Sequence, residues 1–282
     1  MTSLDTGAVQ DVQVDSYALG RSMPLKIVLP PGYDESAGTT YPVLYFLHPW
    51  GLSPHYIVSK LRIDHHLAAG VETGALPPMV IVLPTGEKSF FVNAEDPQGY
   101  DWPRLIDMEN DFFRGALDQY GQYGDYLCNE IIPFVEQHYA VRTERAGRAI
   151  GGISMGGAAA AVHAFRDPAQ FCALGIHSPA LFIGPPEQNG PPWIFGVTRD
   201  RFAAYNPADL AASVSPEVQP RIYLDVGNQD MMAERVKHLH TALDNAGLVH
   251  TYQLRPGGHN KLYWEPNMPE YLAFYSAGWG TP

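Results

Sequence analysis

A serine flanked by glycines, between a strand-like run and an alanine-rich run, constrains this chain more than any other stretch. Residues 151–157 read Gly-Gly-Ile-Ser-Met-Gly-Gly, with Ser154 at the centre. Residues 148–150 before it suit a short buried strand, and residues 158–165 after it have high helix propensity. This context makes a G-x-S-x-G sequence a nucleophile elbow, in which a tight turn between strand and helix exposes the serine. We therefore expect Ser154 to be a catalytic nucleophile.

The residue after this serine has a second expected role. The backbone N–H of Met155 would lie at the N-terminus of the following helix. N–H groups at a helix N-terminus stabilise developing negative charge. We expect Met155 to donate one hydrogen bond to an oxyanion.

Length and charge argue against several kinds of partner. The chain has 282 residues, 45% of them hydrophobic, and a formal net charge of −12. This length predicts one large α/β domain over residues 1–282. Because an acidic surface repels phosphate backbones and anionic membranes, we expect neither nucleic acid nor a membrane as a partner. No apolar stretch of signal-peptide or membrane-span length is visible, which predicts a cytoplasmic location.

Apolar runs alternate with helix-like segments along the chain. Patterns of buried strands fall at residues 9–14, 23–29, 41–47, 79–83, 171–176, 221–226 and 249–254. Helical patterns fall at 56–69, 125–139 and 231–245. Pro133 would kink the second helix or mark its true start. The alternation predicts a mostly parallel sheet wrapped by helices, with an antiparallel start.

Two long segments break this alternation. Residues 85–123 and 178–220 are rich in aromatic residues and turns and have no clear periodicity. Irregular segments of this length are more often functional loop regions than a second domain. We expect them to form the walls of a cleft.

A serine hydroxyl is a weak nucleophile and needs a base, which in turn needs an orienting acid. After a nucleophile elbow, these partners follow in the order serine, acid, histidine. Asp230 follows the predicted strand 221–226, and His259 follows the strand 249–254. Open α/β sheets place their sites at the carboxyl ends of strands. We therefore predict that Asp230 is the acid and His259 the base.

Two other residues are rivals for these roles. Asp225 lies inside the strand, on the face of Tyr223, where it would bond loop N–H groups. His177 also follows a strand, but it precedes the expected acid. The remaining histidines are interpreted as surface or packing residues. His238 and His240 do not share a helix face, so no metal site is expected there, and no cofactor is expected.

Six blocks of sequence resemble the putative-esterase family of α/β-hydrolases. That family includes esterase D (S-formylglutathione hydrolase), feruloyl esterases, enterochelin esterases and the mycobacterial antigen 85 mycolyltransferases. The blocks lie at residues 16–21, 29–34, 42–48, 151–157, 225–230 and 256–259. The resemblance implies the α/β-hydrolase fold, a mostly parallel central sheet with helices on both faces. It also implies a catalytic triad of Ser154, Asp230 and His259.

The resemblance further implies an oxyanion hole made of two backbone N–H groups. One belongs to Met155, and the other to the loop after the strand 41–47, hence Trp50 by position. That loop usually reads His-Gly-x-Gly-Gly in the family, whereas residues 48–52 read His-Pro-Trp-Gly-Leu here. Proline narrows the conformations of the loop, so the donor is either Trp50 or Gly51.

The expected function is that of a serine carboxylester hydrolase that acts on a small-molecule ester through an acyl-enzyme. The candidates for contact with an apolar or aryl acyl group are His48, Phe90, Phe91, Trp193 and Trp264. Transfer of the acyl group to an alcohol, thiol or amine would make the protein an acyltransferase or a cyclase instead. A non-catalytic binding protein on the same fold is the third alternative, which the complete triad disfavours.

Overall fold

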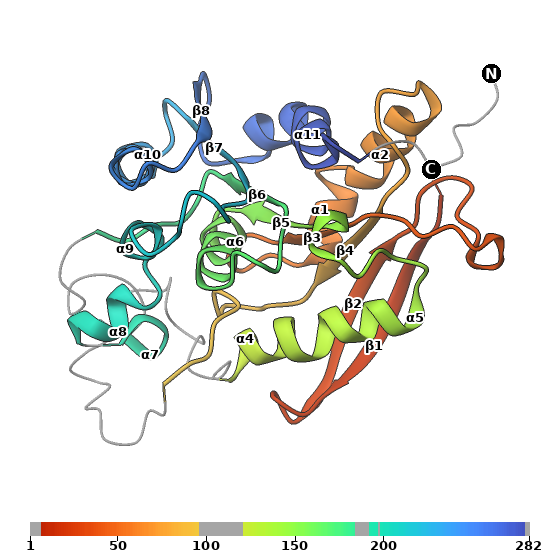
Figure 1. Ribbon diagram of the computed structural model, residues 1–282, viewed down its shortest axis with the longest axis horizontal. Helices are drawn as coiled ribbons and strands as arrows, with labels where there is room; N and C mark the ends of the chain where they lie inside the picture. The colour runs from red at the N-terminus through yellow and green to blue at the C-terminus, as the bar shows by residue number, and fades with distance from the viewer. Residues whose placement is uncertain (1–6, 96–120, 184–191, 197, 280–282) are drawn as a thin grey trace.

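A computed structural model describes residues 7–95, 121–183, 192–196 and 198–279 (Figure 1). Within these residues, eight strands join in one sheet in the order β1-β2-β4-β3-β5-β6-β7-β8. The strands are β1 Val9–Ser16, β2 Arg21–Val28, β3 Val43–Leu47, β4 Val80–Pro84, β5 Arg148–Ile153, β6 Ala173–His177, β7 Arg221–Gly227 and β8 His250–Arg255. The pairs β1–β2 and β2–β4 are antiparallel, and the other pairs are parallel. The predicted mostly parallel sheet with an antiparallel start is confirmed.

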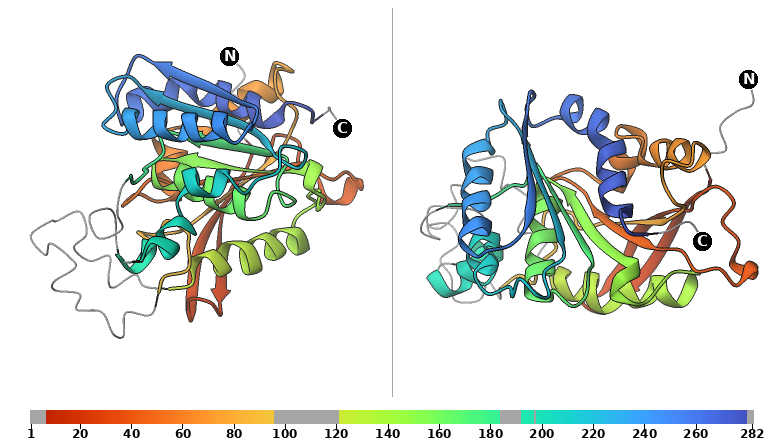
Figure 2. Two further views of the ribbon diagram at one scale, coloured as in Figure 1. Left: turned by 60° about the vertical axis from the view of Figure 1, so that its left-hand side comes forward. Right: turned by 45° about the horizontal axis from the view of Figure 1, so that its top comes forward.

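Helices cover both faces of the sheet (Figures 1 and 2). One face carries α1 Pro54–Ser59, α2 Ile63–Glu72 and α11 Lys261–Ser276, and the other carries α5 Ile132–His138, α6 Met155–Arg166 and α10 Ala233–Asn245. In β3, Val43, Tyr45 and Leu47 pack into one apolar core, and Leu44 and Phe46 into the other. Strands buried on both faces read as continuous apolar runs, which is the pattern of this strand in the sequence.

The helix predicted at 56–69 is two helices. Arg62, between α1 and α2, has a left-handed backbone with φ of 52°. Leu61 beside it is fully buried in the core that α2 also contacts. We infer that burial of this leucine sets the break, which helical periodicity does not reveal.

The helix predicted at 125–139 is continuous but irregular. It begins with α4 Tyr123–Asp125, continues as a π-helical segment Tyr126–Ile131, and ends with α5. Pro133 is in the first turn of α5. Proline has no backbone N–H, so it cannot donate to the π-helical segment that precedes it. Pro133 therefore marks the start of regular α-helix, one of the two outcomes expected for it.

The remaining short elements lie in connections. They are the 3₁₀ turns Glu35–Ala37 and Arg145–Gly147 and the helices α7 Pro192–Phe195, α8 Arg199–Ala203 and α9 Pro207–Ala211. The last three fall in the segment 178–220, for which no regular structure was predicted. Most of the segment 85–123 lies outside the described residues. That the chain forms one domain over residues 1–282 stays a prediction.

One long helix was not predicted at all. Helix α11 follows His259 and contains two prolines, Pro266 and Pro269. Its buried face holds Tyr263, Trp264, Met268, Tyr271, Leu272 and Tyr275. No helix in the described part of the chain has both the length and the apolar character that a bilayer span requires.

Candidate active site

Ser154 occupies a strained turn between β5 and α6. Its φ is 57° and its ψ is −116°, a combination that ordinary residues avoid. Its backbone N–H donates to the carbonyl of His177 at the end of β6 (2.9 Å). A Cβ added to Gly156 would lie 2.1 Å from the carbonyl oxygen of Leu47, so only glycine allows α6 to approach β3 this closely. This geometry is that of a nucleophile elbow.

His259 and Asp230 complete a line of hydrogen bonds that begins at Ser154. The His259 Nε2 is 2.9 Å from the Ser154 Oγ, and its Nδ1 is 2.8 Å from the Asp230 Oδ2. The other carboxylate oxygen of Asp230 accepts from the Met232 N–H (2.8 Å). The Asp230 side chain is fully buried, and 18% of the His259 side chain is exposed. The imidazole can therefore accept the serine proton on its exposed side while the carboxylate holds its other nitrogen.

The loops that carry the acid and the histidine are bonded to one another. The N–H of Gln229 donates to the carbonyl of Gly257 (2.8 Å), and the N–H of Asn228 donates to that of Arg255 (2.7 Å). These bonds extend the β7–β8 pairing beyond the strands. The rivals Asp225 and His177 are not part of this arrangement, because their buried side chains pair with each other.

The His48 side chain holds the loop after β3 through two hydrogen bonds to backbone groups. Its Nε2 accepts the N–H of Gly86 (2.9 Å), and its Nδ1–H donates to the carbonyl of Pro49 (2.8 Å). The side chain is buried, and burial lowers the pKa of His48 to about 4, so the ring is neutral at neutral pH. In place of the expected substrate contact, His48 links this loop to the chain after β4, since backbone groups occupy both of its nitrogens.

Trp50 and Gly51 lie in a turn beside the elbow. The Leu52 N–H donates to the Pro49 carbonyl (3.2 Å), and Gly51 has a φ of 67°. The Trp50 indole is partly buried, with its centroid 5.4 Å from that of Phe90. The last pair between β3 and β5 joins Leu47 to Gly152, and Leu47 also contacts Gly156 in the first turn of α6. The loop after β3 therefore starts beside this turn.

An apolar pocket adjoins the elbow. Its lining includes Phe90, Ala158, Ala159, Ala180, Phe182 and Phe195. The Ala158 and Ala180 N–H groups both donate to the Ser154 carbonyl (3.1 and 2.9 Å), which places this part of the lining next to the backbone of the serine. The free space is narrow, about enough for one water molecule. Phe90, expected to contact substrate, is thus a pocket residue.

The other expected substrate contacts have different surroundings. Phe91 is fully buried, with its ring edge-on to His48 at 5.3 Å. Trp264 is 4% exposed, donates its Nε1–H to the Ser178 Oγ (3.1 Å) and packs edge-on to His259 at 5.0 Å. It supports the histidine from inside the core in place of facing a ligand. The side chain of Trp193 lies outside the described part of the structure.

Comparison with known proteins identifies the family. The fold is that of an α/β-hydrolase. Residues 16–275 match the model of the family described as "Putative esterase". The chain therefore belongs to the putative esterase family, and its class is that of carboxylic ester hydrolases.

Individual relatives are distant. An acetyl esterase of Caldicellulosiruptor saccharolyticus is 25% identical over 209 residues, which cover 66% of this chain and 67% of the relative. Esterase Rv1288 of Mycobacterium tuberculosis is 24% identical over 274 residues, 86% of this chain but only 53% of that protein. The chain thus spans about half the length of the mycobacterial relative. The solved structure of an S-formylglutathione hydrolase from Agrobacterium tumefaciens superposes with a TM-score of 0.77 at 18% identity, over 99% of this chain and 98% of the other. That likeness shows the α/β-hydrolase fold.

Proposed function

We propose that the protein is a serine esterase whose nucleophile is Ser154, whose general base is His259 and whose orienting acid is Asp230. The observation that carries this proposal is the unbroken line of hydrogen bonds from the Ser154 Oγ through His259 to Asp230, at 2.9 and 2.8 Å. A base within this reach of a serine is the geometric requirement for nucleophilic catalysis.

The reaction has two balanced half-steps. The Ser154 Oγ attacks the ester carbonyl while its proton passes to the His259 Nε2, and collapse of the tetrahedral adduct hands that proton to the departing alkoxide. The products of this half are an alcohol and an acyl-enzyme. Water then attacks the acyl carbon, His259 takes a proton from it, and the same proton returns to Ser154 as the carboxylic acid leaves. Asp230 stays ionised and stabilises the imidazolium in both halves.

Two backbone N–H groups would bind the oxyanion, those of Met155 and Trp50. Met155 is the first residue of α6, where N–H groups have no intrahelical acceptor. Trp50 lies in the loop that follows Leu47, and Leu47 is in close contact with Gly156 in the first turn of α6. Donors of this kind stabilise the charge that develops on the carbonyl oxygen.

The acyl group of the substrate would lie in the pocket lined by Phe90, Phe182 and Phe195. The lining is apolar and the space narrow, which favours a short apolar acyl group. Small acyl groups also figure in the names of two similar proteins, an acetyl esterase and an S-formylglutathione hydrolase. An aryl acyl group would require Phe182, a partly buried residue of the lining, to move aside.

The test combines labelling with a substrate panel. The wild type should react once with a fluorophosphonate probe and hydrolyse p-nitrophenyl acetate faster than the decanoate or methyl ferulate. Ser154→Ala should lose labelling and about three to six decades of turnover while staying folded. Retention of more than about a tenth of wild-type turnover would reject Ser154 as the nucleophile. Phe182→Ala should raise the decanoate-to-acetate ratio, and an unchanged ratio would reject this pocket as the acyl site.

The same panel distinguishes hydrolysis from acyl transfer. With an alcohol or amine added, product analysis should still show the free acid as the main product. A dominant ester or amide product would make the protein an acyltransferase with the same Ser154 chemistry. Absence of labelling and of turnover in the wild type would point to a binding protein.

A further inference from the structure

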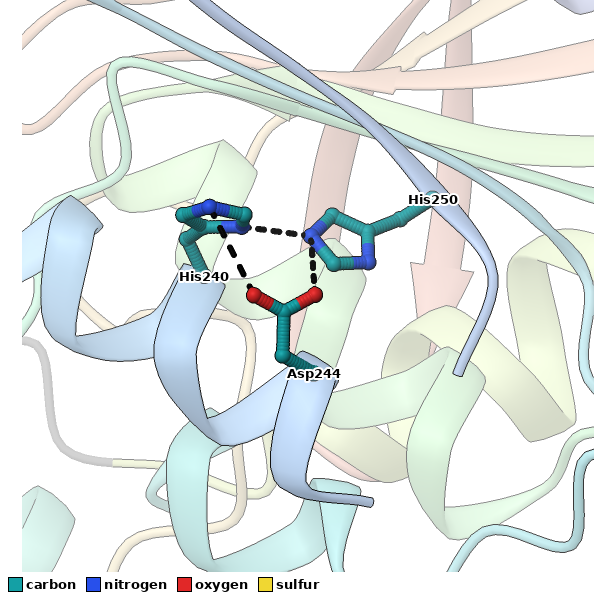
Figure 3. A group of neighbouring side chains, drawn as sticks. All are labelled: His240, Asp244 and His250. Carbon is teal, nitrogen blue, oxygen red and sulfur yellow. Dashed lines mark hydrogen bonds and ion pairs between the residues drawn. The ribbon is translucent and has the colours of Figure 1, made fainter. Parts of the chain in front are cut away.

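Two histidines and an aspartate meet between the C-terminal half of α10 and the start of β8 (Figure 3). The His240 Nδ1 is 2.7 Å from the His250 Nε2. The Asp244 carboxylate lies 3.6 Å from His240 and 4.0 Å from His250. His240 and Asp244 are four residues apart on α10, so they share a helix face, and His250 is the first residue of β8.

The ligand atoms of the three side chains face one another across a short distance. His250 donates its Nδ1–H to the Leu248 carbonyl (2.8 Å), so its neutral ring presents a lone pair on Nε2. The ligand atoms of His240, Asp244 and His250 all lie within 4.8 Å of one another, so a single cation can contact all three.

The surroundings also favour a cation. His240 and Asp244 lie in the last two turns of α10, where the helix dipole is negative. The His240 ring stacks on Tyr252 at 4.2 Å, which restricts its orientation. The bond from His250 to the Leu248 carbonyl is the outer-shell contact that metal-ligating histidines usually make. The His250 side chain is 4% exposed, whereas that of Asp244 is 60% exposed, so an ion can enter from solvent and keep water ligands.

We propose that His240, Asp244 and His250 bind one divalent first-row transition-metal ion, with Zn²⁺ as the probe for it. Two imidazole nitrogens and a carboxylate oxygen suit Zn²⁺, Fe²⁺, Co²⁺ or Ni²⁺ better than Ca²⁺ or Mg²⁺, which prefer oxygen ligands. Small side-chain rotations would bring the three donor atoms to about 2.0–2.2 Å from such an ion. The sequence predicted no metal site made of His238 and His240, which do not share a helix face. The proposed site is a different one, because it joins His240 to Asp244 and His250.

The position of the site gives it a structural role. His250 begins β8, whereas the catalytic candidate His259 follows the opposite end of that strand. β8 is the last strand of the sheet, and a metal ion here would join it to α10. The ion should therefore raise stability and leave ester hydrolysis unchanged.

The experiment is a Zn²⁺ titration of the chelator-treated protein by calorimetry. We expect one Zn²⁺ per chain, and a visible absorption band when Co²⁺ is used. His240→Gln and Asp244→Asn should each weaken Zn²⁺ binding by about tenfold or more. His238→Gln changes an exposed histidine on the same helix and should bind as the wild type does. The melting temperature should rise with Zn²⁺ in the wild type and the control only.

Ester hydrolysis by each variant provides the folding check, since His250 begins β8 and His259 follows the opposite end of that strand. A wild type without Zn²⁺ binding would overturn the proposal. So would wild-type affinity in either His240→Gln or Asp244→Asn, because the ion would then be held elsewhere. Loss of binding in His238→Gln to the same extent would also overturn it.

Discussion

The Oδ1 of Asp225 lies 2.7 Å from the Nδ1 of His177, and both side chains are fully buried. The two rivals for the catalytic acid and base are thus partners of each other. The second carboxylate oxygen accepts from the hydroxyls of Tyr263 and Tyr271 (2.7 Å each), and the His177 Nε2 accepts from the Tyr275 hydroxyl (2.8 Å). Tyrosine hydroxyls of α11 therefore bond this carboxylate, not the loop N–H groups that the sequence led us to expect. Burial raises the pKa of Tyr271 and Tyr275 well above the ordinary value, which keeps them protonated as donors.

Loss of the buried carboxylate should destabilise the protein. In Asp225→Asn, an amide N–H₂ would face hydroxyl or imidazole donors, so at least one buried donor would lose its acceptor. We expect the free energy of unfolding in urea to fall by about 2–4 kcal/mol. Turnover per folded molecule should stay within about tenfold of the wild type, because Asp225 does not contact His259.

Asp230, the proposed catalytic acid, should behave in the opposite way. Asp230→Asn should lower turnover about ten-thousand-fold, because the amide favours the wrong tautomer of His259. Its urea midpoint should change little, since Asn can still accept from the Met232 N–H. Steady-state rates on p-nitrophenyl acetate measure this. Loss of turnover at position 225 with retention at 230 would reverse the assignment of the acid.

Two buried tyrosines provide a matched test of the hydrogen-bond cluster. Tyr275→Phe removes the only hydroxyl shown bonded to the His177 Nε2 and should cost about 1–3 kcal/mol of stability. Tyr45 is equally buried, but its hydroxyl has no hydrogen-bond partner among the described residues. Tyr45→Phe should therefore leave stability unchanged or raise it slightly. If Tyr275→Phe and Tyr45→Phe lost the same stability in thermal or urea unfolding, the hydrogen bond of the Tyr275 hydroxyl would contribute nothing beyond packing.

Stability should fall in mild acid because of His48, which is buried, and His163, which is partly buried. Burial lowers the pKa of both His48 and His163 to about 4, from an unfolded value near 6.5. Between these values the unfolded chain binds protons that the folded chain excludes, so the free energy of unfolding decreases as the pH falls from about 6.5 to about 4. Each histidine contributes a slope of about 1.4 kcal/mol per pH unit.

Urea unfolding between pH 7 and pH 5 measures that slope. His163→Gln should reduce it by about one histidine's share, whatever its effect on stability at pH 7. His138→Gln, at an exposed position on α5, is the control and should leave the slope unchanged. A wild-type slope in His163→Gln would show that this ring is protonated in the folded state.

Local sequence patterns were enough to predict the sheet and the elbow. A buried parallel strand is a short continuous apolar run, and residues 43–47 and 80–84 show that pattern without help from distant contacts. Ser154 could be singled out because strand, glycines and helix lie within one stretch. The order of Asp230 and His259 after it, each beyond a strand, placed both at the same edge of the sheet.

Helix α11 could not be predicted in this way. Pro266 and Pro269 within it each remove a backbone N–H donor, and a sequence pattern with such residues argues against a helix. The helix forms because packing of its tyrosines, Met268 and Leu272 against the sheet outweighs that loss. This gain exists only once the strands that receive these side chains are in place.

The surroundings of single side chains were decided by the tertiary structure alone. By sequence, His48 and Trp264 were candidates to contact a ligand, and Asp225 and His177 were candidates for catalysis. The fold instead buries all four, and it brings His250 from β8 to His240 on α10. Chain order and periodicity determine where a backbone element ends and which edge of the sheet it meets. A buried polar atom needs a hydrogen-bond partner, and the folded chain decides which group provides it. A polar side chain at that edge is therefore open to a ligand only where no distant residue already bonds its polar atoms.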